Sequence, residues 1–217
     1  MYCDCEDSEQ PLRSLVPPGV KLLSKSHWPR YNPEIAKKLF RKAGFCDKKR
    51  LTIPLTFRSN VPADRLFALT WQEQIKRDLS DCLKLSLNGV ESTTIYRQLG
   101  KGSYQAVMLD WRGAYPDPDA YLSPLLSCSK LNELVCQEGE SVISGSYWSK
   151  PGLENSLRRS DLALGEERAQ ILAGIEQQAA QGSAYIPVWL VKPMAWSQLN
   201  ISEPKFDGIG QLLLDQF

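Results

Sequence analysis

Residues 104–122 constrain the fold more than any other stretch of the sequence, because their character changes abruptly halfway along. Residues 106–109 form an unbroken apolar run, which is typical of a strand buried on both faces of a sheet. The loop that follows is crowded with aromatic and charged side chains, and Gly113 and two prolines force its backbone to turn. The sequence therefore predicts a central buried strand at residues 104–110 that feeds a rigid polar loop.

That loop is the first candidate ligand site. Ligands of open α/β sheets bind at the carboxyl ends of the strands, where aromatic and arginine side chains supply contact area and hydrogen bonds. The candidate residues in the loop are Asp110, Trp111, Arg112, Tyr115 and Asp117. The pattern leaves a second interpretation open, in which the loop is a surface turn whose tryptophan and tyrosine cover the edge of the sheet.

Polar residues follow a second predicted strand as well. Residues 51–57 alternate strictly between apolar and polar side chains, which predicts a strand, and Pro54 favours an edge position or a bulge. Arg58 and Asn60 come directly after this strand. They join the candidate ligand-binding residues.

The chain between these two strands alternates in type. Asp64 caps a predicted helix over residues 64–80, residues 83–87 form a further strand, and residues 94–99 form a short helix. Strand, helix, strand, short helix and strand is the pattern of right-handed crossovers on a mainly parallel sheet. The predicted fold class is α/β.

Helix and strand signals also flank this core. Asn32 caps a predicted helix whose Ile35 and Leu39 form an apolar stripe, which we interpret as core packing. Residues 165–181 predict a second amphipathic helix, and residues 184–191 predict a last central strand.

The two ends of the chain are weakly patterned. Residues 1–30 predict a loose, irregular N-terminal arm, because paired prolines disfavour a helix there. Residues 211–214 look like a strand with no partner elsewhere in the sequence.

Composition excludes several classes of protein. The 217 residues are 42% hydrophobic and 24% charged with a formal net charge of +1, so no basic excess supports nucleic-acid binding. No apolar run reaches the roughly 18 residues that span a bilayer, and the first residues lack the charged and apolar regions of a secretory signal. His27 is the one histidine and glycine-rich phosphate loops are absent, so we expect no nucleophilic triad, no nucleotide cofactor and no metal.

The six cysteines give one candidate disulfide. Cys128 and Cys136 flank a short polar loop and could be joined in an oxidising compartment. Cys46 and Cys82 are interpreted as half-buried small hydrophobic residues. The Cys-x-Cys pair near the start lacks the further ligands that a zinc site needs.

Five ordered stretches resemble the C-terminal part of the peptide-binding proteins of bacterial ABC importers, the extracellular solute-binding proteins of family 5. They are YNPEIAKKLFRKAGF at 31–45, LTIPLTF at 51–57 with the helix after it, MLDWRGAYPDPDAYL at 108–122, YWSKPGL at 147–153, and the helix and strand from 167 to 188. The third is similar to the family pattern GWxADYxDPxxFL and the fourth to YSNPEFD.

The resemblance implies one lobe of a periplasmic-binding-protein-like type II fold, with a mixed, mostly parallel sheet flanked by helices. It divides the chain into the irregular arm at 1–30, a solute-binding lobe at 31–191, and a segment at 192–217 that returns towards a first lobe lying outside this sequence. The implied function is the substrate-binding component of a peptide-type ABC importer, which is not an enzyme. The expected location is the periplasm or cell envelope, and the expected partners of this monomer are a peptide or similar small solute and the permease subunits in the membrane.

The resemblance carries over only part of a binding site. Trp111 matches a tryptophan that lines the cleft of the family, but the aspartate that often follows it by three residues is Ala114 here. A peptide amino group buried without a counter-charge is costly, so Asp110 or Asp117 takes over that role or the solute is of another kind. Arg58 lies where some members place an arginine that grips a carboxylate.

Two other functions stay open at this point. A lobe without its counterpart could act as a protein-interaction module. Asp110, Asp117 and Asp119 could instead supply the acid and base of a glycoside hydrolase, although carboxylates beside proline and glycine are more often turn-formers.

Overall fold

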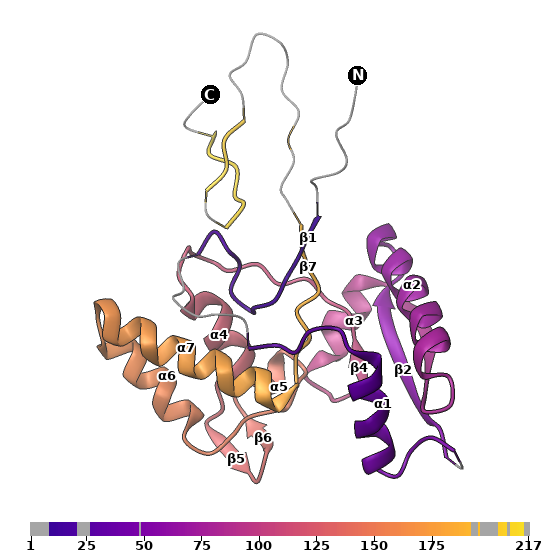
Figure 1. The fold of residues 1–217 in the computed structure, drawn as a ribbon. Helices are drawn as coiled ribbons and strands as arrows, with labels where there is room; N and C mark the ends of the chain where they lie inside the picture. The colour runs from indigo at the N-terminus through magenta and orange to yellow at the C-terminus, as the bar shows by residue number, and fades with distance from the viewer. Residues whose placement is uncertain are drawn as a thin grey trace. The chain divides into compact units, whose positions relative to one another are not determined.

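The computed structural model describes residues 9–20, 27–47, 49–191, 195, 204–207 and 209–214 of the 217. The chain divides into two compact units, which are drawn in Figure 1. One unit is Pro29–Asp110, and the other combines Met1–Trp28 with Trp111–Phe217. The predicted division into an arm at 1–30, a lobe at 31–191 and a return segment at 192–217 stays a prediction.

The unit Pro29–Asp110 is built on a three-stranded parallel sheet, which confirms the predicted α/β class. Strand β2 (Leu51–Arg58) lies in the centre, between β3 (Leu83–Val90) and β4 (Ala106–Val107). The prediction of a central strand at 104–110 is wrong, because β4 is a two-residue edge strand whose side chains are half-buried. An apolar run alone does not tell a strand with two neighbours from one that a helix or loop covers.

Pro54 sits in this central strand without breaking it. Backbone groups of alternate residues point to opposite neighbours, and the bond from the Met108 amide to the Thr56 carbonyl (2.8 Å) shows that even-numbered residues of β2 face β4. Pairing with β4 begins at Leu55, so no strand lies beside Pro54 where its missing N–H would point. The prediction that β2 is an edge strand is therefore wrong, although no strand pairs with it at Pro54 on the side of β4.

Three helices accompany the sheet: α1 (Pro33–Lys42), α2 (Pro62–Leu79) and α3 (Ser92–Leu99). The carboxamide of Asn32 caps α1 by accepting the Ile35 amide hydrogen, as predicted. Helix α2 packs against β2 and β3, and it buries Ala68, Ile75 and Leu79. The interpretation of the α1 stripe as core is wrong, because Ile35 and Leu39 are 57% and 60% exposed.

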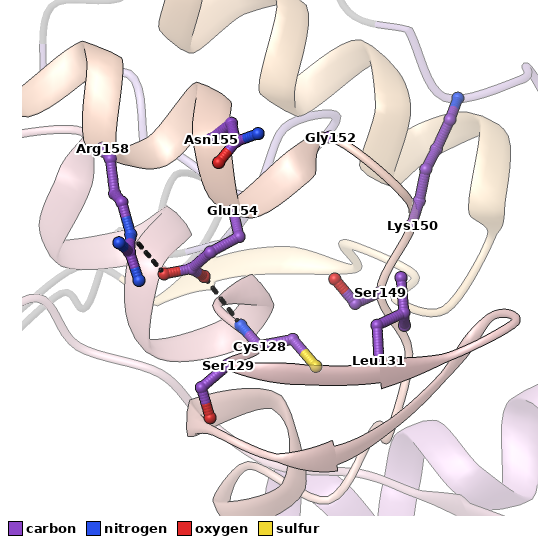
Figure 2. A pocket seen from close by; sticks show the side chains of 9 residues that line it. All are labelled: Cys128, Ser129, Leu131, Ser149, Lys150, Gly152, Glu154, Asn155 and Arg158. Carbon is purple, nitrogen blue, oxygen red and sulfur yellow. Dashed lines mark hydrogen bonds and ion pairs between the residues drawn. The ribbon is translucent and has the colours of Figure 1, made fainter.

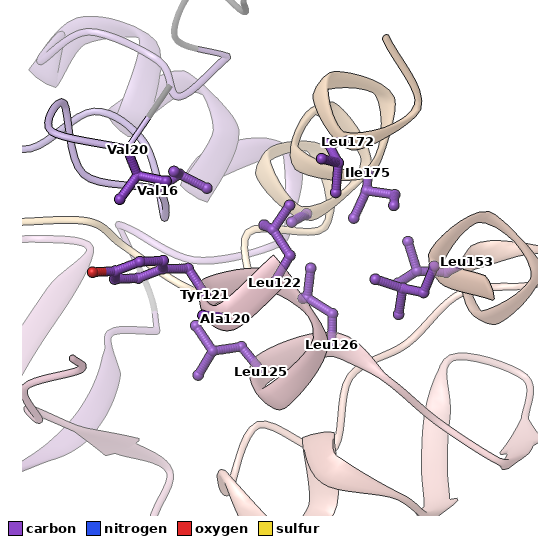
Figure 3. Close-up of a cluster of buried hydrophobic side chains, with 12 residues drawn as sticks. Val16, Val20, Ala120, Tyr121, Leu122, Leu125, Leu126, Leu153, Leu172 and Ile175 are labelled. Carbon is purple, nitrogen blue, oxygen red and sulfur yellow. The ribbon is translucent and has the colours of Figure 1, made fainter. Parts of the chain in front are cut away.

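The other unit is mainly helical. Helix α4 (Asp119–Leu126) lies at its centre, near the pair α6 (Leu153–Leu162) and α7 (Gly165–Gly182), which run side by side in Figure 1. Figure 3 shows the core: leucines of α4 meet Leu153 of α6 and Leu172 and Ile175 of α7. A hairpin of β5 (Lys130–Asn132) and β6 (Val135–Glu138) and the short helix α5 (Glu140–Ile143) complete it.

In the described part of the N-terminal arm, residues 14–20 are irregular but closely packed. Val16 and Val20 are each 3% exposed and belong to the core of α4, α6 and α7 (Figure 3). The buried carboxylate of Glu176 on α7 holds the arm in place by accepting the hydroxyl of Ser14 and the Leu15 amide (3.0 Å). Apolar residues at wide spacing gave no periodic signal, which is why the sequence did not predict this packing.

The C-terminal predictions need correction. The strand expected at 184–191 is reduced to β7 (Trp189–Val191), which pairs antiparallel with β1 (Glu9–Pro11) instead of entering the central sheet. Pro187 removes a backbone donor just before β7. No strand forms at residues 211–214. Leu212 makes one isolated antiparallel bridge to Phe206.

The structure contains two disulfides among its described residues. Cys128 and Cys136, the predicted pair, are joined on the β5–β6 hairpin with Cα atoms 5.8 Å apart. Cys46 and Cys82 are joined as well, across 36 residues of the other unit, where the sequence suggested two separate small hydrophobic residues. Cys3 and Cys5 lie outside the described residues.

Candidate functional site

Arg58 organises the carboxyl end of the sheet. It is the last residue of β2, and it is 8% exposed. Its guanidinium donates two hydrogen bonds to the carboxylate of Asp64, from Nε at 2.7 Å and from Nη2 at 2.9 Å, and its Nη1 donates to Asp110. A planar guanidinium held in this two-pronged way has little freedom to move.

Asp64 is the buried partner of this arginine. The sequence suggested that it caps α2, but the cap residue is Val61, which offers no side-chain bond, and Asp64 lies inside the first turn. It is 2% exposed, so its charge needs the guanidinium beside it. The hydrogen bond to Asp64 raises the pKa of Arg58, and it outweighs the opposing effect of burial.

Asp110 is the group of this cluster that faces solvent. Its side chain is 67% exposed, and one carboxylate oxygen accepts both Arg58 and the hydroxyl of Tyr96 (2.6 Å). Burial, and then the hydrogen bond to Asp110, raise the pKa of Tyr96, so its hydroxyl remains a donor at neutral pH. The cluster holds one guanidinium and two carboxylates and is therefore anionic.

Asn60 ties together the ends of β2 and β3. Its side-chain oxygen accepts the amide of Ser92 (3.1 Å) and the hydroxyl of Ser92 (2.6 Å), and its nitrogen donates to Glu91 at 3.4 Å. The predicted ligand contact Asn60 is thus engaged in holding the start of α3.

The strand order places this cluster at a switch point. The connection after β2 leads to β3 on one side, and the next connection crosses back to β4 on the other. Ligands of open parallel sheets bind outside the carboxyl ends of the two strands between which the order reverses. Arg58 ends β2, and Asp110 follows β4, so these two residues flank that position.

Trp111 begins the other unit and is fixed at one edge. Its indole Nε1–H donates to the carbonyl of Ala120 at 3.2 Å, while 47% of the residue is exposed. That carbonyl is available because Pro124, four residues further along α4, has no N–H to donate. The proline therefore has a role beyond limiting the helix: it leaves an acceptor for the indole.

The loop after Trp111 is closely held. A Cβ atom at Gly113 would lie 2.6 Å from the ring of Tyr121, so only glycine lets this ring approach the backbone. Tyr115 is 49% exposed, and its hydroxyl donates to Asp119 at 3.0 Å. Arg112 and Ala114 are exposed.

Asp117 is committed to an ion pair. Arg168 of α7 donates to its two oxygens at 2.7 and 2.8 Å, and the Asp119 amide donates to it at 2.8 Å. These bonds, that to Arg168 first, lower the pKa of Asp117. Asp119 accepts Ser123 and Tyr115, so two of the three carboxylates of the hydrolase hypothesis, Asp117 and Asp119, hold this loop together.

The seven predicted site residues thus fall into two groups. Arg58, Asn60 and Asp110 belong to the unit Pro29–Asp110, and Trp111, Arg112, Tyr115 and Asp117 belong to the other. Arg58 and Asp110 contact each other directly. Sequence reasoning missed Asp64 and Tyr96 as their partners; Asp64 had a capping role assigned to it, and no spacing rule links Tyr96 to a strand end.

No group of three or more histidine, cysteine, aspartate or glutamate side chains among the described residues is arranged to hold a metal ion. None of the described helices is both long enough and apolar enough to cross a membrane.

Comparison with known proteins identifies the family. The model of the bacterial extracellular solute-binding proteins, family 5, matches residues 5–133. The periplasmic oligopeptide-binding protein OppA of Salmonella typhimurium is 26% identical over 197 residues, which are 84% of this chain and 33% of that protein. Di/tripeptide-binding protein 4 of Pseudomonas aeruginosa is 25% identical over 167 residues, or 74% of this chain and 28% of that protein.

Solved structures show the same fold. A dipeptide-binding protein from Pseudoalteromonas sp. SM9913 in complex with Met-Leu matches with a TM-score of 0.72 at 21% identity, covering 97% of this chain and 40% of that one. OppA of Burkholderia pseudomallei matches with a TM-score of 0.70 at 21% identity, covering 86% and 35%. The chain spans about a third of the length of the curated relatives named above. The chain belongs to the bacterial extracellular solute-binding proteins of family 5.

Proposed function

We propose that this chain is the C-terminal lobe of the substrate-binding component of a peptide-type ABC importer. It binds a peptide in the periplasm or cell envelope and delivers it to permease subunits in the membrane. The relatives named above are peptide-binding proteins, and the described sheet carries its polar cluster at the end where such folds bind ligands.

The observation that carries this proposal is the exposed carboxylate of Asp110 at the switch point. Arg58 and Tyr96 orient it, and Arg58 is already neutralised by buried Asp64. The cluster therefore attracts a cation, and the amino terminus of a peptide is a cation that also donates hydrogen bonds. Asp110 in this way supplies the counter-charge that Ala114 does not provide.

Trp111 and Tyr115 contribute apolar contact area in the proposal. Each is about half exposed, and each has its polar atom bonded within the same unit. A ring fixed in this way loses little conformational entropy when a side chain packs on it. Asp117 is assigned to Arg168 and does not contact the peptide.

Calorimetric titration of the chain with a dipeptide and a tripeptide, each with a free or an acetylated amino terminus, tests the proposal. We expect acetylation to weaken binding about fivefold, the equivalent of roughly 1 kcal/mol for a partly exposed ion pair. Asp110→Asn is expected to remove this difference, and Trp111→Ala to weaken both forms of each peptide.

Two variants away from the proposed contacts serve as controls. Asp81→Asn changes an exposed carboxylate at the amino end of β3, the opposite end of the sheet, and Tyr31→Ala changes an exposed aromatic residue before α1. Both are expected to bind like the unmodified protein. Equal affinity for free and acetylated peptides would remove Asp110 from the site, and unchanged affinity in Trp111→Ala would remove Trp111.

A second candidate function is a protein-interaction module. The observation that favours it is the apolar stripe of α1, where Ile35 and Leu39 are 57% and 60% exposed. The DNA upstream of the codon for Met1 separates the two functions. An in-frame sequence that encodes a further lobe supports the importer, and a stop codon supports the module.

A further inference from the structure

A pocket of about 290 Å³ lies in the unit that contains α6, and none of the residues of the proposed peptide site lines it (Figure 2). It is bounded by the start of α6 and by the residues around the disulfide-bonded Cys128. Ser149, Lys150 and Gly152 line it on the side where the chain enters the helix.

The first turn of α6 borders this pocket and leaves two backbone amides without an acceptor among the described residues. Its cap residue is Gly152, which has no side chain to accept a hydrogen bond. The Leu153 amide bonds to Lys150 and the Ser156 amide bonds to Gly152. The amides of Glu154 and Asn155, the two that a capping side chain normally satisfies, have no acceptor among the residues that the structure describes.

Ser149 also lines the pocket, with a buried hydroxyl. The residue is 1% exposed, yet its hydroxyl makes no hydrogen bond with any described residue. Figure 2 shows the hydroxyl directed into the pocket, towards the space between Glu154 and Cys128. A buried hydroxyl without a partner is costly, and such groups in folded proteins are normally bonded to protein, water or a ligand.

The charges around the pocket favour an acceptor. The carboxylate of Glu154 is already occupied, because its two oxygens accept the Cys128 amide (2.9 Å) and Nε of Arg158 (3.3 Å). Lys150 stands at the rim with its ammonium directed outward in Figure 2, on a stem that can swing. Lys150 and Arg158 against Glu154 leave the lining with a net positive charge, and the positive end of the α6 dipole adds to it.

We propose that this pocket binds a small oxyanion, with phosphate as the model ligand. The hydroxyl of Ser149 and the amides of Glu154 and Asn155 donate hydrogen bonds to its oxygens, and Lys150 closes over it. The oxygens of an oxyanion accept hydrogen bonds, and the hydroxyl of Ser149 and the two amides without an acceptor can donate them. The anion is either free in solution or part of a phosphate monoester.

Titration with inorganic phosphate, with O-phosphoserine and with acetate, each against chloride at equal ionic strength, tests this proposal. We expect saturable phosphate binding with a Kd in the millimolar range. Ser149→Ala is expected to weaken it about threefold, as for one hydrogen bond, without lowering the melting temperature, because the hydroxyl has no partner to lose. Tighter binding of O-phosphoserine than of phosphate would identify a monoester as the ligand, and the reverse would identify the free anion.

Two charge variants sharpen the test. Glu154→Gln keeps an acceptor for the Cys128 amide but removes a negative charge, so it is expected to tighten phosphate binding. Lys150→Gln is expected to weaken it, and Lys130→Gln, on the adjacent hairpin and 67% exposed, is expected to have no effect. The proposal is overturned if phosphate acts no differently from chloride, or if Ser149→Ala and Lys130→Gln bind phosphate equally well.

Discussion

Pro124 shows that a sequence rule can describe the local effect of a residue and still miss its role in the folded structure. A proline inside a helix removes a backbone hydrogen bond and tends to break it, yet α4 continues through Pro124 to Leu126. The missing N–H leaves the carbonyl of Ala120 to the indole of Trp111, at 3.2 Å. No sequence rule links a proline to a tryptophan thirteen positions earlier, because the link runs through the folded helix.

The substitution Pro124→Ala tests this link. The new N–H can donate to the Ala120 carbonyl four residues back, so the indole of Trp111 loses its exclusive acceptor. We expect the Nε1–H resonance of Trp111 to shift upfield and its hydrogen exchange to quicken, in an NMR spectrum assigned with Trp111→Phe. Pro116→Ala, in the exposed part of the loop, serves as the control and should leave this resonance in place. A resonance that is unchanged in Pro124→Ala would contradict the proposed role of the proline.

The elements show which signals in the sequence were reliable. Helix α1 begins after its Asn32 cap, and α7 ends at Gly182, because capping and periodicity are properties of the local chain. What the sequence did not reveal depends on distant partners, such as the exposure of the α1 stripe and the pairing of β1 with β7. The loop after Trp111 also depends on a distant partner, because Arg168 of α7 bonds to Asp117, which lies 51 residues earlier in the chain.

The contribution of that ion pair is expected to depend on pH. Arg168 lowers the pKa of Asp117 in the folded state, so the pair stabilises the fold above the unfolded pKa of about 3.9 and loses its effect as the pH falls through the lower folded value. Asp117→Asn should reduce the free energy of unfolding by about 1–2 kcal/mol at neutral pH, since the groups are partly exposed, and by less near pH 3. Urea unfolding across this range measures the difference, with Asp81→Asn as control. A deficit of the same size at both pH values would show that the charge is not responsible.

At the scale of the whole molecule, each compact unit carries its own disulfide. Cys46–Cys82 spans 36 residues in Pro29–Asp110, and Cys128–Cys136 spans 8 in the other unit. The sequence indicated only the second pair, because close spacing in sequence suggests closeness in space, whereas the first pair meets only when β3 aligns beside β2. The family and the α/β class were both evident from the sequence, since five ordered motifs do not require knowledge of long-range contacts.

Removing each disulfide should weaken a different unit. The chain-entropy relation gives a loss of about 4 kcal/mol for the longer loop and about 2.5 kcal/mol for the shorter. We therefore expect the variant with Cys46→Ala and Cys82→Ala to lose more hydrogen-exchange protection, and to lose it within Pro29–Asp110. The variant with Cys128→Ala and Cys136→Ala should lose protection around the hairpin instead. Loss in the opposite unit, or the reverse order of magnitudes, would contradict the assignment of one disulfide to each unit.

The open side of β3 has a consequence for self-association. Among the described residues β3 pairs only with β2, so its outward backbone groups could template a strand from another molecule, which is the usual route to edge-to-edge aggregation. Gln72 of α2 donates its side-chain amide to the carbonyl of Leu85 at 2.9 Å and occupies one of these groups midway along the strand. An incoming strand would have to break this bond to pair in register, so Gln72 opposes the addition of a strand from another molecule at β3.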